Sequence, residues 1–184
     1  MGVVLMWARS LVMGSFLYAF GACALAATLQ QLTIEEMAQK STEIVRGRVG
    51  SCVGEVRGPV IYTRCRISAT EHWKGAPGAT LELVIPGGTA GGFTQKFTGT
   101  PVLGPGQEYV FFLWAGRSGM NQILGLSQGL FELGADGKTG VQAKREASHE
   151  LMLGPDGSPV SDTTVRMGVS ELRTRVAKAL GEVK

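Results

Sequence analysis

The sequence predicts a mainly β protein, a small antiparallel barrel or sandwich with a short N-terminal helix and a C-terminal amphipathic helix. Three observations support this fold class. Short segments alternate apolar and polar residues, Gly- and Pro-rich turn signals separate them, and strands do not alternate with long helices. We therefore expect about eight or nine short strands in one β-rich domain that spans residues 27–184.

The first 26 residues have the pattern of a secretory signal peptide. Arg9 is their only charged residue, an apolar stretch follows it, and an Ala-Leu-Ala cleavage site ends at Ala26. We expect cleavage after Ala26 and export to the periplasm or the extracellular medium. Two alternatives stay open: an uncleaved helix over residues 2–27, which is long enough to span a membrane, and lipid attachment at Cys23.

The charges of the exported part are nearly balanced. Cleavage removes Arg9 from the 18 basic residues, which leaves 17 against 15 acidic residues and a net charge of +2. The basic residues are scattered, so we expect no nucleic-acid partner. We expect a protein or another envelope component as partner, and membrane contact only through the first segment if it is retained or lipidated.

The cysteine count agrees with export, because loss of Cys23 leaves an even pair, Cys52 and Cys65. These two residues flank a turn-like stretch between two strand-like segments. A hairpin that folds about residues 57–59 would place Cys52 opposite Cys65, where directly opposed Cα atoms are close enough for a disulfide. The alternative is two free buried thiols.

Helical patterns occur at both ends of the predicted domain. Thr33 and Glu36 form a capping box, which predicts a short helix within residues 32–40. Apolar residues recur at helical spacing from Val169 to Leu180, which predicts an amphipathic helix over about residues 169–180.

The strand patterns lie between these helices, at 43–53, 60–70, 80–85, 109–114, 122–126 and 129–133, with a hairpin around 154–157. The segment 109–114 is the most apolar, and turn residues bound it on both sides. This is typical of a central strand that is buried on both faces. Asp136 and Gly137 predict a further tight hairpin.

A Gly-rich segment follows the third predicted strand. Gly87, Gly88, Gly91 and Gly92 predict a flexible loop, which is the candidate partner-binding loop. The segment lacks the Lys-Ser/Thr and the following helix of a phosphate-binding loop. We therefore expect no nucleotide cofactor.

The strongest enzyme-like motif is a G-x-S-x-G sequence centred on Ser127, with Asp136 and His149 following in the order of a hydrolase triad. The residues after Gly129 predict a strand, whereas the hydrolase motif requires a helix at that point. A strand pair with glycines at a bulge or close contact explains the motif better. His72 and His149 lack metal-ligand spacing, so we expect no metal site and no catalytic residue.

Several short motifs recur in an order that resembles a family of uncharacterised exported bacterial proteins: Ile44-Val45-x-Gly47-x-Val49, Tyr62-Thr63, Trp73-Lys74-Gly75, Pro86-Gly87-Gly88 and Gly125-Leu126-x-Gln128-Gly129. The order of Ile44-Val45-x-Gly47-x-Val49, Tyr62-Thr63 and Lys74-Gly75 is also similar, more distantly, to the opening strands of netrin-like and TIMP-like OB barrels. That resemblance implies an OB-like five-stranded barrel core with decorations. Metalloproteinase inhibition by some such barrels requires an N-terminal Cys, which the predicted mature chain lacks.

Taken together, these features predict a non-enzymatic exported β-barrel that acts as a binding or envelope interaction module. One alternative is a protease-inhibitor-like or protease-associated barrel, which rests on fold analogy. The other is a small serine hydrolase that uses Ser127.

Overall fold

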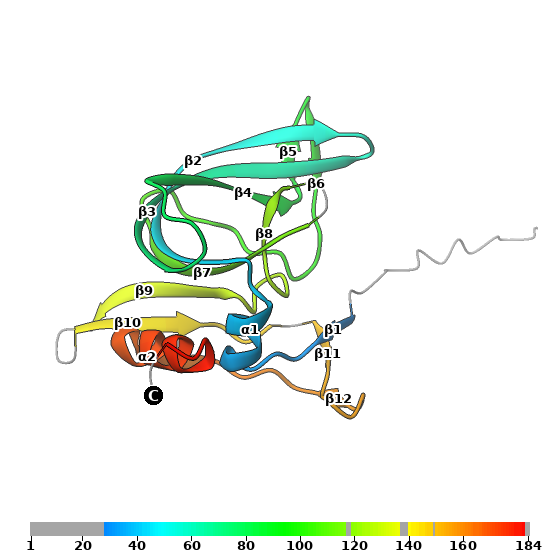
Figure 1. Cartoon of the computed structure of the whole chain (residues 1–184). Coiled ribbons are helices and arrows are strands. Elements are labelled where there is room, and N and C mark those ends of the chain that lie inside the picture. Colours follow the sequence, from blue (N-terminus) through cyan, green and yellow to red (C-terminus); the bar gives the residue numbers. More distant parts are fainter. Residues whose placement is uncertain (1–27, 117–118, 137–139, 149, 183–184) are drawn as a thin grey trace, which may run out of the picture.

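The computed structural model describes residues 28–116, 119–136, 140–148 and 150–182. It is mainly β, with a curved sheet and two short helices (Figure 1). The predicted signal peptide, its cleavage site and Cys23 lie outside the described residues. Within the described part of the chain, no helix has the length and apolar character needed to cross a membrane.

Eight strands form the main sheet, in the order β13-β10-β9-β7-β2-β3-β4-β8. Their bounds are β2 Glu43–Arg57, β3 Val60–Lys74, β4 Thr80–Pro86, β7 Glu108–Ala115, β8 Asn121–Ile123, β9 Leu130–Asp136, β10 Gly140–Arg145 and β13 Val165–Gly168. The short strand β8 pairs with both β4 and β7, so the pairings from β7 through β2, β3 and β4 to β8 return to β7. The sheet is therefore barrel-like (Figure 1). The β4–β8 contact is a single parallel pair, Leu83 opposite Asn121.

The hairpin of β2 and β3 has the predicted register. Arg57 lies opposite Val60 across a turn at Gly58 and Pro59, and the same register places Cys52 opposite Cys65. Both strands are longer than the sequence predicts, because the β2–β3 pairing continues to Arg57 in β2 and to Lys74 in β3. Register shifts interrupt the ladder near the start of β2 and between Val49 and Cys52.

Strand β7 is buried on both faces, as its apolar run predicts. Tyr109, Phe111 and Leu113 belong to the core inside the barrel-like part of the sheet. Val110 and Phe112 belong to a second core beneath the helices. Alternation along one strand therefore supplies both cores.

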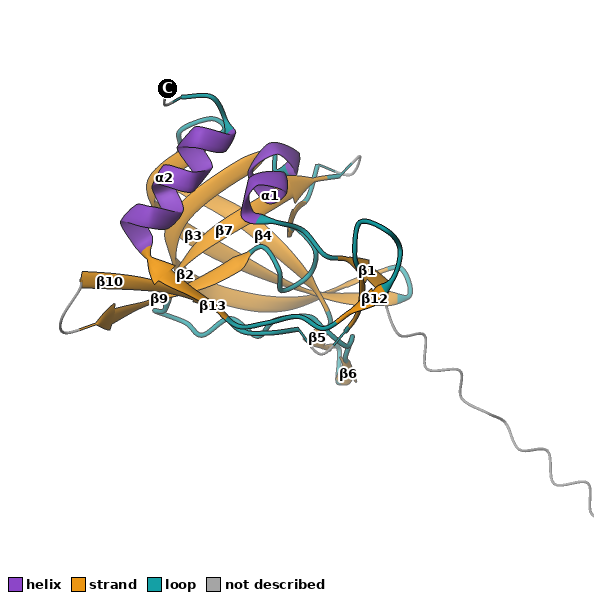
Figure 2. Ribbon diagram, turned by 90° about the horizontal axis from the view of Figure 1, so that it is seen from below, coloured by secondary structure: helices purple, strands orange, loops and turns teal. Residues whose placement is uncertain are grey.

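Helices α1, Ile34–Lys40, and α2, Val169–Ala179, pack against each other over that second core (Figure 2). At the start of α1 the Thr33 hydroxyl accepts from the N–H of Glu36, and the Glu36 carboxylate accepts from the N–H of Thr33. This is the capping box that the sequence predicts. From α2, Leu172 and Val176 enter the core.

Five short strands complete the fold, in two small sheets. Strands β1 Thr28–Gln30, β11 Leu151–Leu153 and β12 Pro159–Val160 form one, and β5 Gly88–Ala90 and β6 Phe93–Gln95 form the other. The sequence predicts no strand over residues 28–30, where β1 lies. It also predicted a strand over 122–126, whereas β8 ends at Ile123 and residues 124–129 form turns. The prediction was wrong at this point because Gly125 and Leu126 both adopt positive φ, which ends an extended strand.

Candidate functional site

The Gly-rich segment that was expected to be a flexible loop is a hairpin made of β5 and β6. Ala90 lies opposite Phe93, and Gly91 and Gly92 between them have φ values of +57° and +80°. Two consecutive positive φ angles define a type I′ turn, which joins twisted antiparallel strands. Gly91 and Gly92 therefore form the hairpin tip, while Gly87 and Gly88 lie at its base.

Hydrogen bonds hold this hairpin against β3. The N–H of Gly87 donates to the carbonyl of Ile61 at 2.7 Å, and the hydroxyl of Thr63 donates to the carbonyl of Gly87 at 2.7 Å. The side-chain carbonyl of Gln95 accepts from the N–H of Ile61 at 2.7 Å. On β2, a Cβ at Gly54 would lie 2.0 Å from the carbonyl oxygen of Thr89, so only glycine permits this close approach.

The hairpin forms one wall of a cavity of about 520 Å³ at this end of the sheet. The other walls come from three places: Cys52, Thr63 and Cys65 on β2 and β3, Ile85 and Pro86 at the end of β4, and residues 96–97 and 100–103. Small-molecule sites commonly occupy about 300–1,000 Å³ and often lie at the mouths of barrels. The cavity thus has the size of a ligand site, and the disulfide forms part of its wall. Of the four glycines in the predicted partner-binding loop, Gly87 and Gly88 line the cavity.

Exposed apolar side chains surround the cavity. Val102 is 93% exposed and Phe97 is 39% exposed, and both line the cavity. Phe93, next to the hairpin tip, is 75% exposed. Phe97 and Val102 thus give the cavity an exposed apolar rim, and such grouped side chains mark interaction surfaces more often than single exposed ones do.

The polar side chains that line the cavity already have partners within the protein. The hydroxyls of Thr89 and Thr94 lie 2.9 Å apart, and the Thr100 hydroxyl donates to the carbonyl of Phe97 at 2.7 Å. Thr63 and Gln95 bind the backbone as described above. Lys96 differs from these side chains, because its ammonium group has no hydrogen-bond or ion-pair partner among the described residues. Of the described residues that line the cavity, Lys96 alone is charged.

Cys52 and Cys65 form a disulfide, with Cα atoms 4.1 Å apart. The sequence prediction of this bond is confirmed. Neither residue is a free thiol, so neither is available as a nucleophile. Disulfides persist in oxidising compartments, so the bond is characteristic of an exported protein.

The G-x-S-x-G motif does not have the geometry of a hydrolase. Ser127 lies within the turns of residues 124–129, and strand β9 follows directly. Asp136 ends that seven-residue strand, which at a rise of about 3.3 Å per residue places its backbone roughly 20 Å from the strand's start. The structure therefore does not bring Ser127 and Asp136 together. The third residue, His149, lies outside the described residues.

Gln128, within the same motif, has a structural role that the sequence did not reveal. Its side chain is buried, with 1% of its surface exposed. The side-chain carbonyl accepts from the N–H of Leu32 at 3.0 Å, and the side-chain NH₂ donates to the carbonyl of Gln30 at 3.0 Å. In addition, a Cβ at Gly129 would lie 2.9 Å from the carbonyl oxygen of Phe112. The motif is therefore explained by close packing and by attachment of the N-terminal strand β1.

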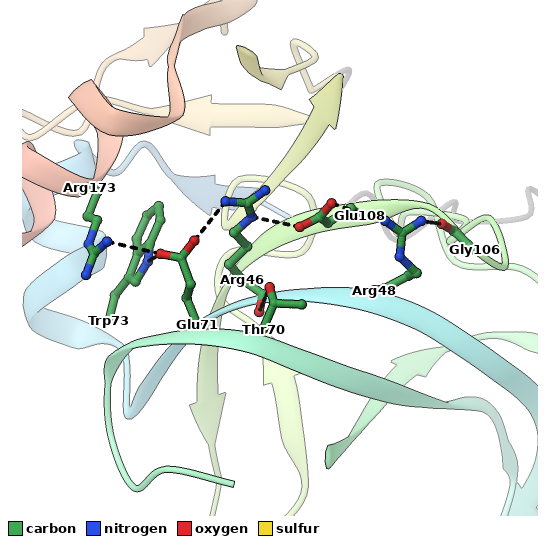
Figure 3. A network of polar contacts seen from close by, with 8 residues as sticks. All are labelled: Arg46, Arg48, Thr70, Glu71, Trp73, Gly106, Glu108 and Arg173. Atoms are coloured by element: carbon green, nitrogen blue, oxygen red, sulfur yellow. Dashed lines mark hydrogen bonds and ion pairs between the residues drawn. The ribbon is translucent and has the colours of Figure 1, made fainter. Parts of the chain in front are cut away.

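A second group of polar side chains lies on the outside of the sheet, between β2, β3, β7 and α2 (Figure 3). Arg46 binds Glu71 and Glu108, each at 2.7 Å, and Arg173 from α2 reaches Glu71 at 3.2 Å. The indole N–H of Trp73 donates to Glu71 at 3.0 Å. This hydrogen bond and then Arg46 hold the pKa of Glu71 below its ordinary value, against the opposing effect of burial. These charged side chains pair with one another, so they connect strands β2, β3 and β7 to helix α2 and do not form an open binding site.

The described residues contain no cluster of three or more His, Cys, Asp and Glu side chains able to hold a metal ion. His72 contacts the backbone of Gly78 through Nε2. Among known proteins, no protein-family model matches this chain, and a search of curated proteins finds no relative. The candidate site thus rests on the geometry of the cavity.

Proposed function

We propose that this protein is a non-enzymatic exported binding module, and that it takes an apolar group of an envelope component into the cavity beside the β5–β6 hairpin. One observation carries the proposal: a cavity of about 520 Å³ has the apolar, exposed Phe97 and Val102 in its lining. Burial of such side chains against an apolar partner is favourable, at about 25 cal/mol for each Å² removed from water.

Two further features support export and a binding role. The disulfide between Cys52 and Cys65 belongs to an oxidising compartment, and it braces the strands that carry the cavity. The polar network around Arg46 is internally satisfied, whereas the cavity beside the hairpin is open and has exposed apolar side chains in its lining.

We also propose that the barrel-like part of the sheet is OB-like and distantly related to netrin-like and TIMP-like barrels. The support is the set of pairings that runs through five strands, β7, β2, β3, β4 and β8, and returns to β7. Protease inhibition does not follow, because the predicted mature chain lacks an N-terminal Cys.

Retention of envelope components on the immobilised protein tests the function. We expect the natural sequence to retain a component, identified by mass spectrometry of proteins and lipids, and Phe97→Asp to lose it. Leu151→Asp is the matched control, because Leu151 is 49% exposed on a different sheet, at β11. Equal retention by Phe97→Asp and the natural sequence, with both variants folded, would exclude the cavity as the binding site.

A further inference from the structure

We propose that the cavity binds a long-chain carboxylate, with the apolar chain inside and the carboxylate beside Lys96. This inference rests on the proposed function and names the chemistry of its ligand. It depends on what the cavity leaves available to a ligand: apolar walls and one unpaired cation.

The apolar walls come first. Ile85, Pro86, Phe97, Val102 and Leu103 contribute them, together with the disulfide. An alkyl chain needs only such a surface, since its binding is driven by removal of apolar area from water. The cavity volume of about 520 Å³ is within the range of small-ligand sites.

The polar lining argues against a ligand that is polar throughout, such as a sugar. The hydroxyls of Thr63, Thr89, Thr94 and Thr100 each contact a partner inside the protein. The side-chain carbonyl of Gln95 accepts from the backbone of β3. A ligand rich in hydroxyls would lose hydrogen bonds to water on entering and would have to break these internal bonds to replace them.

Lys96 supplies the polar end of the site. It is exposed, and none of the described residues that line the cavity carries a carboxylate. A lysine can keep its ammonium group in water while its stem lies along apolar surface, which suits the junction of an alkyl chain and an anionic head. A carboxylate there would gain a charge-assisted hydrogen bond from Lys96 at the rim.

Calorimetric titration with dodecanoate, kept below its micelle concentration, tests this inference on the purified exported protein. We expect saturable binding of one molecule, and Lys96→Gln should weaken the affinity about three- to fivefold, as for an exposed ion pair. Lys178→Gln, a change at an exposed lysine on α2, should leave the affinity unchanged. Dodecanol, which lacks the charge, should bind the natural sequence and Lys96→Gln equally well.

Three results would overturn the inference: no binding of dodecanoate, the same loss for dodecanol as for dodecanoate in Lys96→Gln, or unchanged dodecanoate affinity in Phe97→Asp. If dodecanoate does not bind but an envelope protein is still retained in a Phe97-dependent manner, the ligand class is wrong and the proposed function stands. If neither depends on Phe97, both proposals fail.

Discussion

The side-chain carbonyl of Gln128 accepts a hydrogen bond from the backbone N–H of Leu32, a residue 96 positions earlier in the chain. The same amide donates to Gln30, so one buried side chain occupies two backbone groups of the N-terminal segment. The Gln128 side chain thus satisfies backbone groups that no strand of the described residues pairs with, at the point where the chain leaves β1 and leads into α1.

Replacing Gln128 by Ala should lower the free energy of unfolding by about 2–3 kcal/mol, because two hydrogen bonds are lost and a cavity is created. Ser127→Ala is the matched control at the neighbouring position and should change stability by less than about 0.5 kcal/mol. Urea unfolding measures both values, and amide hydrogen exchange should show faster opening of residues 28–30 in Gln128→Ala alone. A larger effect from Ser127→Ala would contradict the role given to Gln128.

Loss of the Cys52–Cys65 disulfide should cost about 2–3 kcal/mol, because the bond closes a short loop of the unfolded chain. The double variant Cys52→Ser, Cys65→Ser, compared with the natural sequence in urea, measures this cost. Thiol titration of the denatured, unreduced exported protein should find no free thiol at either position. Two reactive thiols would contradict the bond.

Asp162 should be among the most sensitive charged positions. Its side chain has no exposed surface and binds Nη1 and Nη2 of Arg145 at 3.0 Å and 2.7 Å, while the N–H of Ser148 donates to it at 2.8 Å. Asp162→Asn should destabilise the protein by about 3 kcal/mol, since it leaves the buried guanidinium without its counter-charge. Glu146→Gln, which breaks an exposed ion pair with Lys144, should cost less than about 0.5 kcal/mol. Similar costs for both changes would contradict this assignment.

The network around Glu71 should make stability depend on acid pH. Its pKa in the folded protein lies below the ordinary value of 4.5, so the folded state binds this proton less tightly than the unfolded state. The stabilisation is therefore complete above about pH 4.5 and is lost as pH falls through the lower, folded pKa. We expect Glu71→Gln to lower the free energy of unfolding by about 1 kcal/mol at pH 7, a small value because the Glu71 side chain is partly exposed to solvent. Below pH 4.5 the loss should become progressively smaller.

Thermal unfolding of both proteins between pH 3 and pH 7 measures this effect. Trp73→Phe removes the N–H donor that contributes most to the pKa shift and should reduce the pH-dependent part of the difference. If the difference in thermal stability between the natural sequence and Glu71→Gln stayed the same down to pH 3, the role given to the Glu71 carboxylate would be contradicted.

The sequence by itself determined the features that depend on neighbouring residues. The continuous apolar run at 109–114 predicted a strand buried on both faces, and the turn at Gly58 and Pro59 predicted the register that joins Cys52 to Cys65. Periodicity and turn geometry act over a few residues and are independent of the rest of the fold. They are therefore visible in a single sequence.

Only the tertiary structure decided where these elements meet. The hydrogen bond of Gln95 to Ile61 joins residues 34 positions apart, and Gln128 reaches the N-terminal strand across more than 90. The glycines after β4 predicted a flexible loop, yet this segment forms a hairpin in which Thr89 packs closely against Gly54 of β2. The hairpin lines the cavity. Such contacts depend on the shape of the whole core, which no local pattern encodes.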